Sequence, residues 1–223
     1  MARFSLLFVP LTFFVSTGLA DHHERKLTEH PEFPAEGYKV IYDGSDLSKI
    51  QTEGNWQIRE DGTLELVPRP GEKGWQRYGS YLWLPDRYED FVVDFDFKYD
   101  KGGNSGLYFR ISDESDATAH GWEVQILDNY GQDKQLTHHD MGGVIQTSPP
   151  LKNASLKPGE WNQMTVQLVG THLQVLINGQ LVQDVDMSKT KPADKELAEK
   201  GKIAIQDHGQ PFAVRSIQVK RLD

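Results

Sequence analysis

Polar side chains suited to acid–base chemistry and hydrogen bonding alternate with apolar ones in two neighbouring runs of the sequence. Residues 104–111 read NSGLYFRI and set Asn104, Tyr108 and Arg110 in one alternating series, while residues 122–127 read WEVQIL and do the same with Glu123 and Gln125. A glutamate placed in this way can act as a base, and a nearby arginine can position it or stabilise a developing negative charge. The same arginine would lower the pKa of the glutamate and weaken it as a base. Tyrosine and glutamine beside that pair would suit a polar ligand with an apolar face, such as a sugar.

These side chains lie on segments that alternate as strands do, with successive residues on opposite faces of a sheet. Three such segments each have one apolar face. It is formed by Val93, Phe95 and Phe97 in residues 91–98, by Leu107, Phe109 and Ile111 in residues 104–111, and by Trp122, Val124 and Ile126 in residues 122–127. If the three strands are neighbours, as sequential strands are roughly two-thirds of the time, their polar faces form a single patch.

Alternation alone leaves two interpretations of this patch open. Antiparallel sheets commonly have one wet face, and opposite charges across strands stabilise pairing, so the patch would then have no ligand. Alternatively, the polar groups are aimed at a substrate. Gly102, Gly103 and Gly106 flank Asn104, as expected where a backbone bends or where another group approaches it closely, and this favours the second interpretation.

Length, composition and charge restrict the class of protein. The chain has 223 residues, 37% of them hydrophobic, which suits one soluble domain with a real core. Its formal net charge of −9 argues against nucleic-acid binding, which needs a basic face. The sequence has no cysteine, so the fold is expected to rely on its core instead of disulfides.

The N-terminal residues indicate export. Residues 1–20 have Arg3 before an apolar run and small residues at Gly18 and Ala20, the pattern of a signal peptide. Residues 21–37 are polar and contain proline, which is typical of a linker. No later run approaches the ~20 apolar residues of a membrane span. We therefore expect a secreted or periplasmic protein without a membrane anchor.

The rest of the chain, residues 38–223, reads as short strands separated by turns. About ten runs rich in β-branched and aromatic residues are divided by Asp-Gly, Asn-Gly or Pro-Gly pairs, and Asn178-Gly179 is placed as the turn of a hairpin. Helical periodicity occurs only around residues 195–200, for one or two turns. The pattern predicts one all-β domain, an antiparallel sandwich or jelly roll.

Several of these segments, taken in order, resemble one known family. GGNSGLYFR (102–110) and HGWEVQILDN (120–129), together with YKVIYDGSDLSK, PGEWNQMTVQLVG and GKIAIQDHG, are similar to the 3-keto-disaccharide hydrolases, also described as 3-keto-glucoside lyases and 3-keto-2-hydroxy-glucal hydratases. The resemblance spans residues 38–222. It implies a concanavalin-like or laminin-G-like jelly-roll sandwich of two antiparallel sheets that acts on an oxidised (3-keto) glycoside at its concave face.

A ketone at C3 of a glucoside acidifies the C2 hydrogen, so a base can start elimination of the aglycone from C1, and addition of water completes a net hydrolysis. This route needs a base, an electrophile for the enolate oxygen and an acid for the leaving group. Glu123 is the first candidate for the base, and Arg110 would position it or stabilise the enolate. A histidine is better tuned near neutral pH, and we include His208 of the QDHG segment as a third catalytic candidate.

The remaining candidates would bind the substrate. They are Asn104, Tyr108, Gln125 and His138, with Trp75 and Tyr78 of a glycine-rich loop placed to stack on a sugar. No cofactor is certain, but His138-His139-Asp140 could form a corner for a divalent metal ion. The alternative function is a non-catalytic, lectin-like glycan-binding module, because a fold does not fix a function.

Overall fold

The computed structural model describes residues 33–34, 36–190 and 195–223. The expected signal peptide and most of the expected linker lie outside the described residues. Within the linker segment Phe33 is described, and its ring is buried against Val92 and Leu176. This contact ties the chain just before the domain to the larger of two sheets.

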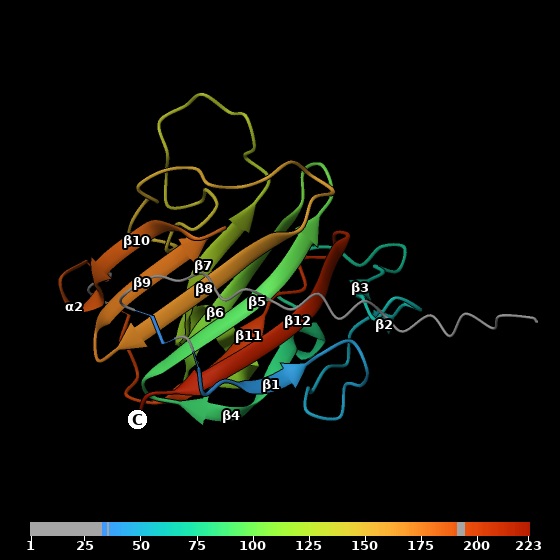
Figure 1. Cartoon of the computed structure of the whole chain (residues 1–223), viewed down its shortest axis with the longest axis horizontal. Helices are drawn as coiled ribbons and strands as arrows, with labels where there is room; N and C mark the ends of the chain where they lie inside the picture. Colours follow the sequence, from blue (N-terminus) through green and yellow to red (C-terminus); the bar gives the residue numbers. More distant parts are fainter. Residues whose placement is uncertain (1–32, 35, 191–194) are drawn as a thin grey trace, which may run out of the picture.

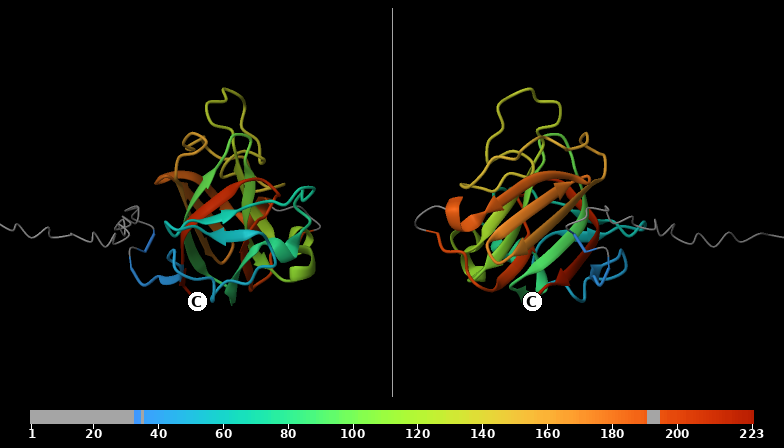
Figure 2. Two further views of the ribbon diagram at one scale, coloured as in Figure 1. Left: turned by 90° about the vertical axis from the view of Figure 1, so that its right-hand side faces the viewer. Right: turned by 60° about the vertical axis from the view of Figure 1, so that its left-hand side comes forward.

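Two antiparallel sheets make up the fold, and Figure 1 looks onto the larger one with the smaller one behind it. The larger sheet runs in the order β10 (Gln180–Asp186), β9 (His172–Ile177), β8 (Asn162–Val169), β5 (Phe91–Tyr99), β12 (Phe212–Arg221), β3 (Leu64–Leu66) and β2 (Trp56–Ile58), and β1 (Lys39–Tyr42) also pairs with β12. The smaller sheet runs in the order β4 (Leu82–Tyr88), β11 (Gly201–Ile205), β6 (Asn104–Ile111) and β7 (Trp122–Leu127). The two further views in Figure 2 show the same two layers. The predicted all-β jelly-roll sandwich is confirmed.

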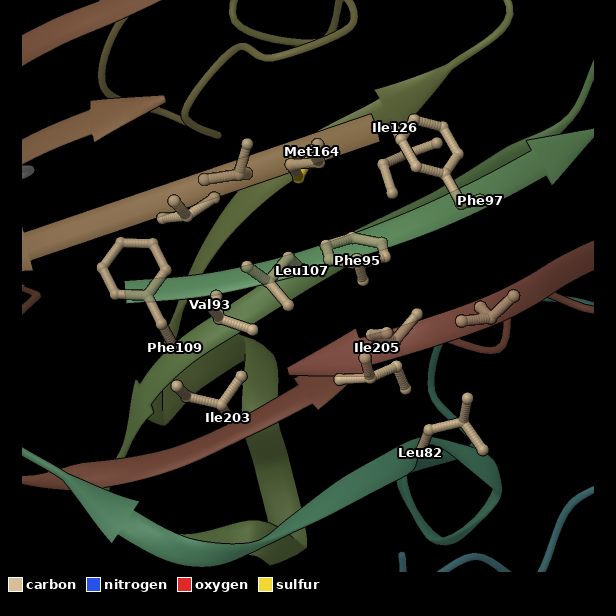
Figure 3. Close-up of a cluster of buried hydrophobic side chains, with 14 of the residues drawn as sticks. Leu82, Val93, Phe95, Phe97, Leu107, Phe109, Ile126, Met164, Ile203 and Ile205 are labelled. Atoms are coloured by element: carbon tan, nitrogen blue, oxygen red, sulfur yellow. The ribbon is translucent and has the colours of Figure 1, made fainter. Parts of the chain in front are cut away.

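The core lies between the sheets and is built from the apolar faces that alternation predicts. Val93, Phe95 and Phe97 of β5 are fully buried, and Figure 3 shows them close to Leu107 and Phe109 of β6. Trp122, Val124 and Ile126 of β7 belong to the same cluster. The polar residues between them therefore point away from the core.

Turns and short helices connect the strands. In the β9–β10 hairpin Asn178 and Gly179 have φ of 50° and 74°, the left-handed conformation that a two-residue turn needs, so this prediction is confirmed. The described helices are η1 (Tyr78–Ser80), η2 (Glu114–Asp116), α1 (Ala117–His120) and α2 (Met187–Thr190). No helix of the described residues is long and apolar enough to cross a membrane.

The helix expected around residues 195–200 is not formed, and this prediction is wrong. The carbonyls of this segment bond to distant side chains instead of to a following helical turn. Trp122 Nε1 donates to Glu196 O at 3.3 Å, and Arg110 Nη1 donates to Ala198 O at 2.5 Å. A helix of one or two turns is too short to outweigh such tertiary bonds.

Candidate active site

A cavity of about 340 Å³ opens on the face of the smaller sheet that points away from the core. Strands β6 and β7 supply its polar floor, with Asn104, Tyr108, Glu123 and Gln125. Surrounding segments contribute the other lining residues, which are Trp75, Thr118, His139, Ile145, Gln146, Lys195, Gln206 and His208. The polar row of the two strands thus faces an open space instead of forming only the wet side of a sheet.

The pairing of β6 with β7 fixes the position of the Glu123 carboxylate. Tyr108 lies directly opposite Glu123, and Gly106 lies opposite Gln125. Tyr108 Oη donates to Glu123 Oε2 at 2.6 Å. A Cβ atom added to Gly106 would lie 2.1 Å from Glu123 Oε1. The carboxylate therefore lies across the neighbouring strand at a position where only glycine leaves room for it.

Burial raises the pKa of Glu123 from its ordinary value of 4.5 to about 7, although the Tyr108 hydrogen bond and the charge of Lys195 both act to lower it. The residue is only 9% exposed. Among the described residues, none donates a hydrogen bond to its second oxygen, Oε1. A carboxylate with a pKa near neutrality and one open oxygen is suited to accept and return a proton.

Gln206 extends this hydrogen-bonded group. Its Nε2 donates to Tyr108 Oη at 3.4 Å, and its Oε1 is buried with no partner in the described part of the chain. Tyr108 has a single hydroxyl proton, which it gives to Glu123, so it can only accept from Gln206. That fixes the orientation of the amide and leaves Gln206 Oε1 as a buried acceptor next to the cavity, without a partner among the described residues.

Arg110 does not line the cavity, and the prediction that it lies beside Glu123 is wrong. Its backbone has φ of 51°, and β6 shifts register against β11 at this point. The alternation therefore changes phase, and Ile111 packs in the same cluster as Tyr108 instead of with Leu107 and Phe109. The Arg110 side chain is buried elsewhere and donates to the carbonyls of Glu89 and Ala198 and to Asp90.

Of the other predicted site residues, Asn104, Tyr108, Gln125, Trp75 and His208 line the cavity with Glu123, while Tyr78 and His138 do not. The Tyr78 hydroxyl bonds to the side chains of Asp116 and Thr118 instead. The Nδ1 atom of His138 accepts a hydrogen bond from the Gln146 backbone N–H. The next residue, His139, lines the cavity instead.

The metal corner suggested by His138-His139-Asp140 is not formed. Asp140 is fully buried within its own loop, where it accepts hydrogen bonds from the Thr137 backbone and from Asn129 and pairs with Lys134 at 2.8 Å. Across the described ranges, no group of three or more histidine, aspartate and glutamate side chains could hold a metal ion.

One buried ion pair joins the loop that carries Trp75 to the loop that carries His208. Arg77 Nη2 contacts Asp207 Oδ1 at 2.5 Å, and the Asp207 side chain is fully buried. Burial lowers the pKa of the His208 imidazole, so His208 is neutral at pH 7 and can accept or donate a proton. The pair positions an aromatic face and a titratable group at the same cavity.

Five lining residues were missed by the sequence reasoning, namely Thr118, Ile145, Gln146, Lys195 and Gln206, while His139 was expected as part of the metal corner. Gln206 directly follows a predicted strand beside the QDHG candidate His208, so its place next to that residue was a usable signal. Thr118 lies in the short helix α1, and Ile145, Gln146 and Lys195 lie in loops whose course depends on tertiary contacts, so no local pattern marks them.

Residues 37–220 match the family model described as the 3-keto-alpha-glucoside-1,2-lyase-like domain. The chain belongs to this family. A 3-keto-disaccharide hydrolase of Bacteroides thetaiotaomicron is 27% identical in an alignment 236 residues long. The alignment covers 85% of this chain and 80% of that protein. The resemblance of the sequence to the 3-keto-alpha-glucoside-1,2-lyase-like family is thus confirmed.

Solved structures agree with the lyase-like family's sandwich fold. A putative glycosyl hydrolase from Parabacteroides distasonis has 28% identity and a TM-score of 0.69, over 84% of this chain and 100% of that one. A Bacillus subtilis protein with a galectin-like fold has 16% identity and a TM-score of 0.56, over 83% of this chain and 94% of that one, and shows the fold alone.

Proposed function

We propose that this protein is an enzyme that cleaves the glycosidic bond of 3-keto-glycosides, including 3-keto-disaccharides, by elimination followed by hydration. The family description and the name of the Bacteroides thetaiotaomicron relative support a carbohydrate substrate and hydrolytic chemistry. The observation that carries the proposal is Glu123, a buried carboxylate with one open oxygen and a pKa of about 7 on the floor of a polar cavity.

In the proposed reaction Glu123 takes the proton from C2 of the 3-keto sugar. The electron pair of the C–H bond forms the C2–C3 double bond, and the ketone oxygen becomes an enolate. The enolate then re-forms the ketone and a C1–C2 double bond, and the bond from C1 to the aglycone oxygen breaks. The aglycone oxygen takes up a proton, and the sugar is left as an enone. Water adds to C1 of the enone, and the net result is hydrolysis. A base whose pKa matches the working pH serves such a proton transfer well.

The acid for the leaving group is Glu123 itself, which holds the C2 proton after the first step, or the protonated form of a histidine that lines the cavity. His208 and His139 both line the cavity, and burial lowers the pKa of His208 so that it does not carry a fixed charge. Protonated Glu123 could also return its proton to the departing oxygen. The pH profiles of His208→Gln and His139→Gln variants separate these cases, because only loss of the true acid removes the alkaline limb of kcat.

The test is release of the aglycone from a p-nitrophenyl 3-keto-glucoside and from a 3-keto-disaccharide, with the unoxidised parent glycosides as substrate controls. We expect release from the keto substrates only, and loss of release in Glu123→Gln. The half-buried Glu114, which lies outside the cavity, gives the matched control, and Glu114→Gln should keep full activity. Measurable glycan binding without release from any keto substrate would show instead a lectin-like module.

We also propose that the protein is exported, because residues 1–20 have the pattern of a cleaved signal peptide. Expression of the full chain in a bacterium, followed by fractionation and N-terminal sequencing, tests this. A mature protein outside the cytoplasm that begins at Asp21 is the expected result. An uncleaved cytoplasmic chain would contradict the proposal.

A further inference from the structure

A positively charged side chain lines the cavity, and neither the sequence patterns nor the family description assigns it a role. Of the described residues that line it, Lys195 is the one lysine or arginine. It lies on the connection between α2 and β11. The sequence prediction placed Arg110 in the role of an electrophile, but Arg110 is bonded to carbonyls outside the cavity. The cation that lines the cavity together with Glu123 is therefore a different residue.

Three contacts fix Lys195 although it lies on a long connection. Its Nζ donates to Thr118 O at 2.8 Å and lies 4.9 Å from the centre of the Trp122 ring. The next residue, Glu196, accepts the hydrogen bond from Trp122 Nε1. Trp122 is the first residue of β7 and directly precedes Glu123. The strand that presents the carboxylate therefore also anchors the ammonium group.

The charge of Lys195 acts on Glu123 in the resting site, where it favours the ionised carboxylate. When Glu123 takes the C2 proton, the negative charge leaves the carboxylate and moves to the ketone oxygen of the substrate. A fixed cation that lines the same cavity then interacts with the enolate. Preorganised charges that face a developing anion are commonly the largest single contribution to catalysis.

We propose that Lys195 is a catalytic residue whose ammonium group donates a hydrogen bond to the enolate oxygen formed at C3. An ammonium group donates up to three hydrogen bonds, so a ligand oxygen would join or replace one of the contacts that Lys195 makes, of which the bond to Thr118 O is one. No covalent bond to Lys195 forms or breaks in this step. The proton goes to Glu123, the electron pair moves through C2–C3, and the aglycone leaves from C1. The inference rests on the proposed function, because it needs a substrate with a ketone.

The experiment compares Lys195→Met, Lys195→Arg and Lys202→Met with the wild type on the p-nitrophenyl 3-keto-glucoside. Lys202 is the matched control because it also donates to backbone carbonyls, those of Leu84 and Pro85, but does not line the cavity. We expect Lys195→Met to lower kcat by about a hundredfold with little change in KM, as for loss of one donor to an oxyanion. Lys195→Arg should restore about a tenth or more of kcat, and Lys202→Met should keep full activity.

A second readout separates catalysis from structure. The groups that act on Glu123 are Tyr108 and Lys195, and the titratable groups that line the same cavity are His139 and His208. Because Lys195 holds the pKa of Glu123 down, Lys195→Met should move the acidic limb of kcat/KM to higher pH. It should leave the limb in place if the ammonium group lies too far from Glu123 to act on charge in the cavity.

The outcomes are distinct. A Lys195→Met enzyme with kcat within twofold of the wild type, or with an unmoved acidic limb, overturns the inference while the proposed function stands. Loss of kcat that Lys195→Arg does not restore, together with a large fall in Tm, also overturns it and shows a structural role. A wild type that releases nothing from any keto substrate overturns the proposed function itself, and Lys195 then has no enolate to stabilise.

Discussion

Replacing Glu123 by glutamine should abolish activity and at the same time stabilise the protein at alkaline pH. Glutamine has the same shape, and its amide oxygen can still accept the hydrogen bond that Tyr108 Oη now donates to Glu123 Oε2. What the substitution removes is the negative charge of a carboxylate that is almost fully buried. The cost of ionising that carboxylate in the folded state therefore disappears.

The size of the effect follows from the raised pKa. Below pH 4.5 the carboxyl group is protonated in both the folded and the unfolded chain, so it contributes no difference. Between pH 4.5 and about 7 the unfolded chain has lost the proton while the folded chain keeps it, so stability falls as the pH rises. Above pH 7 the full penalty is present, on the order of 3 kcal/mol for this difference in pKa.

The assay is thermal unfolding of wild type, Glu123→Gln and Glu114→Gln from pH 4 to pH 8.5. For a domain of this size, roughly 2–4 °C of Tm corresponds to 1 kcal/mol, so Glu123→Gln should exceed the wild type by about 6–12 °C at pH 8.5. The two should coincide near pH 4, and Glu114→Gln should follow the wild type throughout. A Tm gap that does not change with pH, or a less stable Glu123→Gln at pH 8.5, would refute the reasoning.

Three further predictions follow from the same geometry. Gly106→Ala places a Cβ where Glu123 Oε1 now lies, so we expect a fall in kcat of about a hundredfold or more in a folded protein, and a normal kcat would contradict the close approach. Arg110→Met should lower stability by about 3 kcal/mol, because Asp90 and three backbone carbonyls lose their donor, and the folded variant should keep its kcat. An inactive but equally stable Arg110→Met would restore Arg110 as a catalytic candidate. The exposed Trp75 at the cavity should affect binding alone, so Trp75→Ala should raise KM about tenfold without a change in Tm, and an unchanged KM would exclude stacking on the substrate.

Much of the fold could be predicted because its information is local. Alternation in residues 91–98 and 122–127 identified both the core face and the polar face, and Asn178-Gly179 identified a hairpin turn. Tyr108, Glu123 and Gln125 follow from that alternation, since side chains on one face of paired strands must lie together. The family resemblance then predicted a carbohydrate site at this face.

The errors at Arg110 and Lys195 have physical causes that no local pattern contains. Alternation assumes an extended backbone, and the positive φ of Arg110 reverses the direction of the side chain at a single residue. Residues 195–200 have a helical pattern, but their carbonyls bond to side chains far away in the sequence. Arg110, which was expected in the cavity, therefore points away from it. Lys195, which was expected on a short helix, lines the cavity instead.

The order of the strands has a consequence for synthesis of the chain. Strand β11 lies between β4 and β6 in the smaller sheet, and β12 lies between β5 and β3 in the larger one. Both sheets therefore remain divided until the ribosome has made residues 201–221, and Gln206, Asp207 and His208 come with them. A nascent chain that ends after α2 has neither a closed core nor a cavity, so activity must arise in one late step.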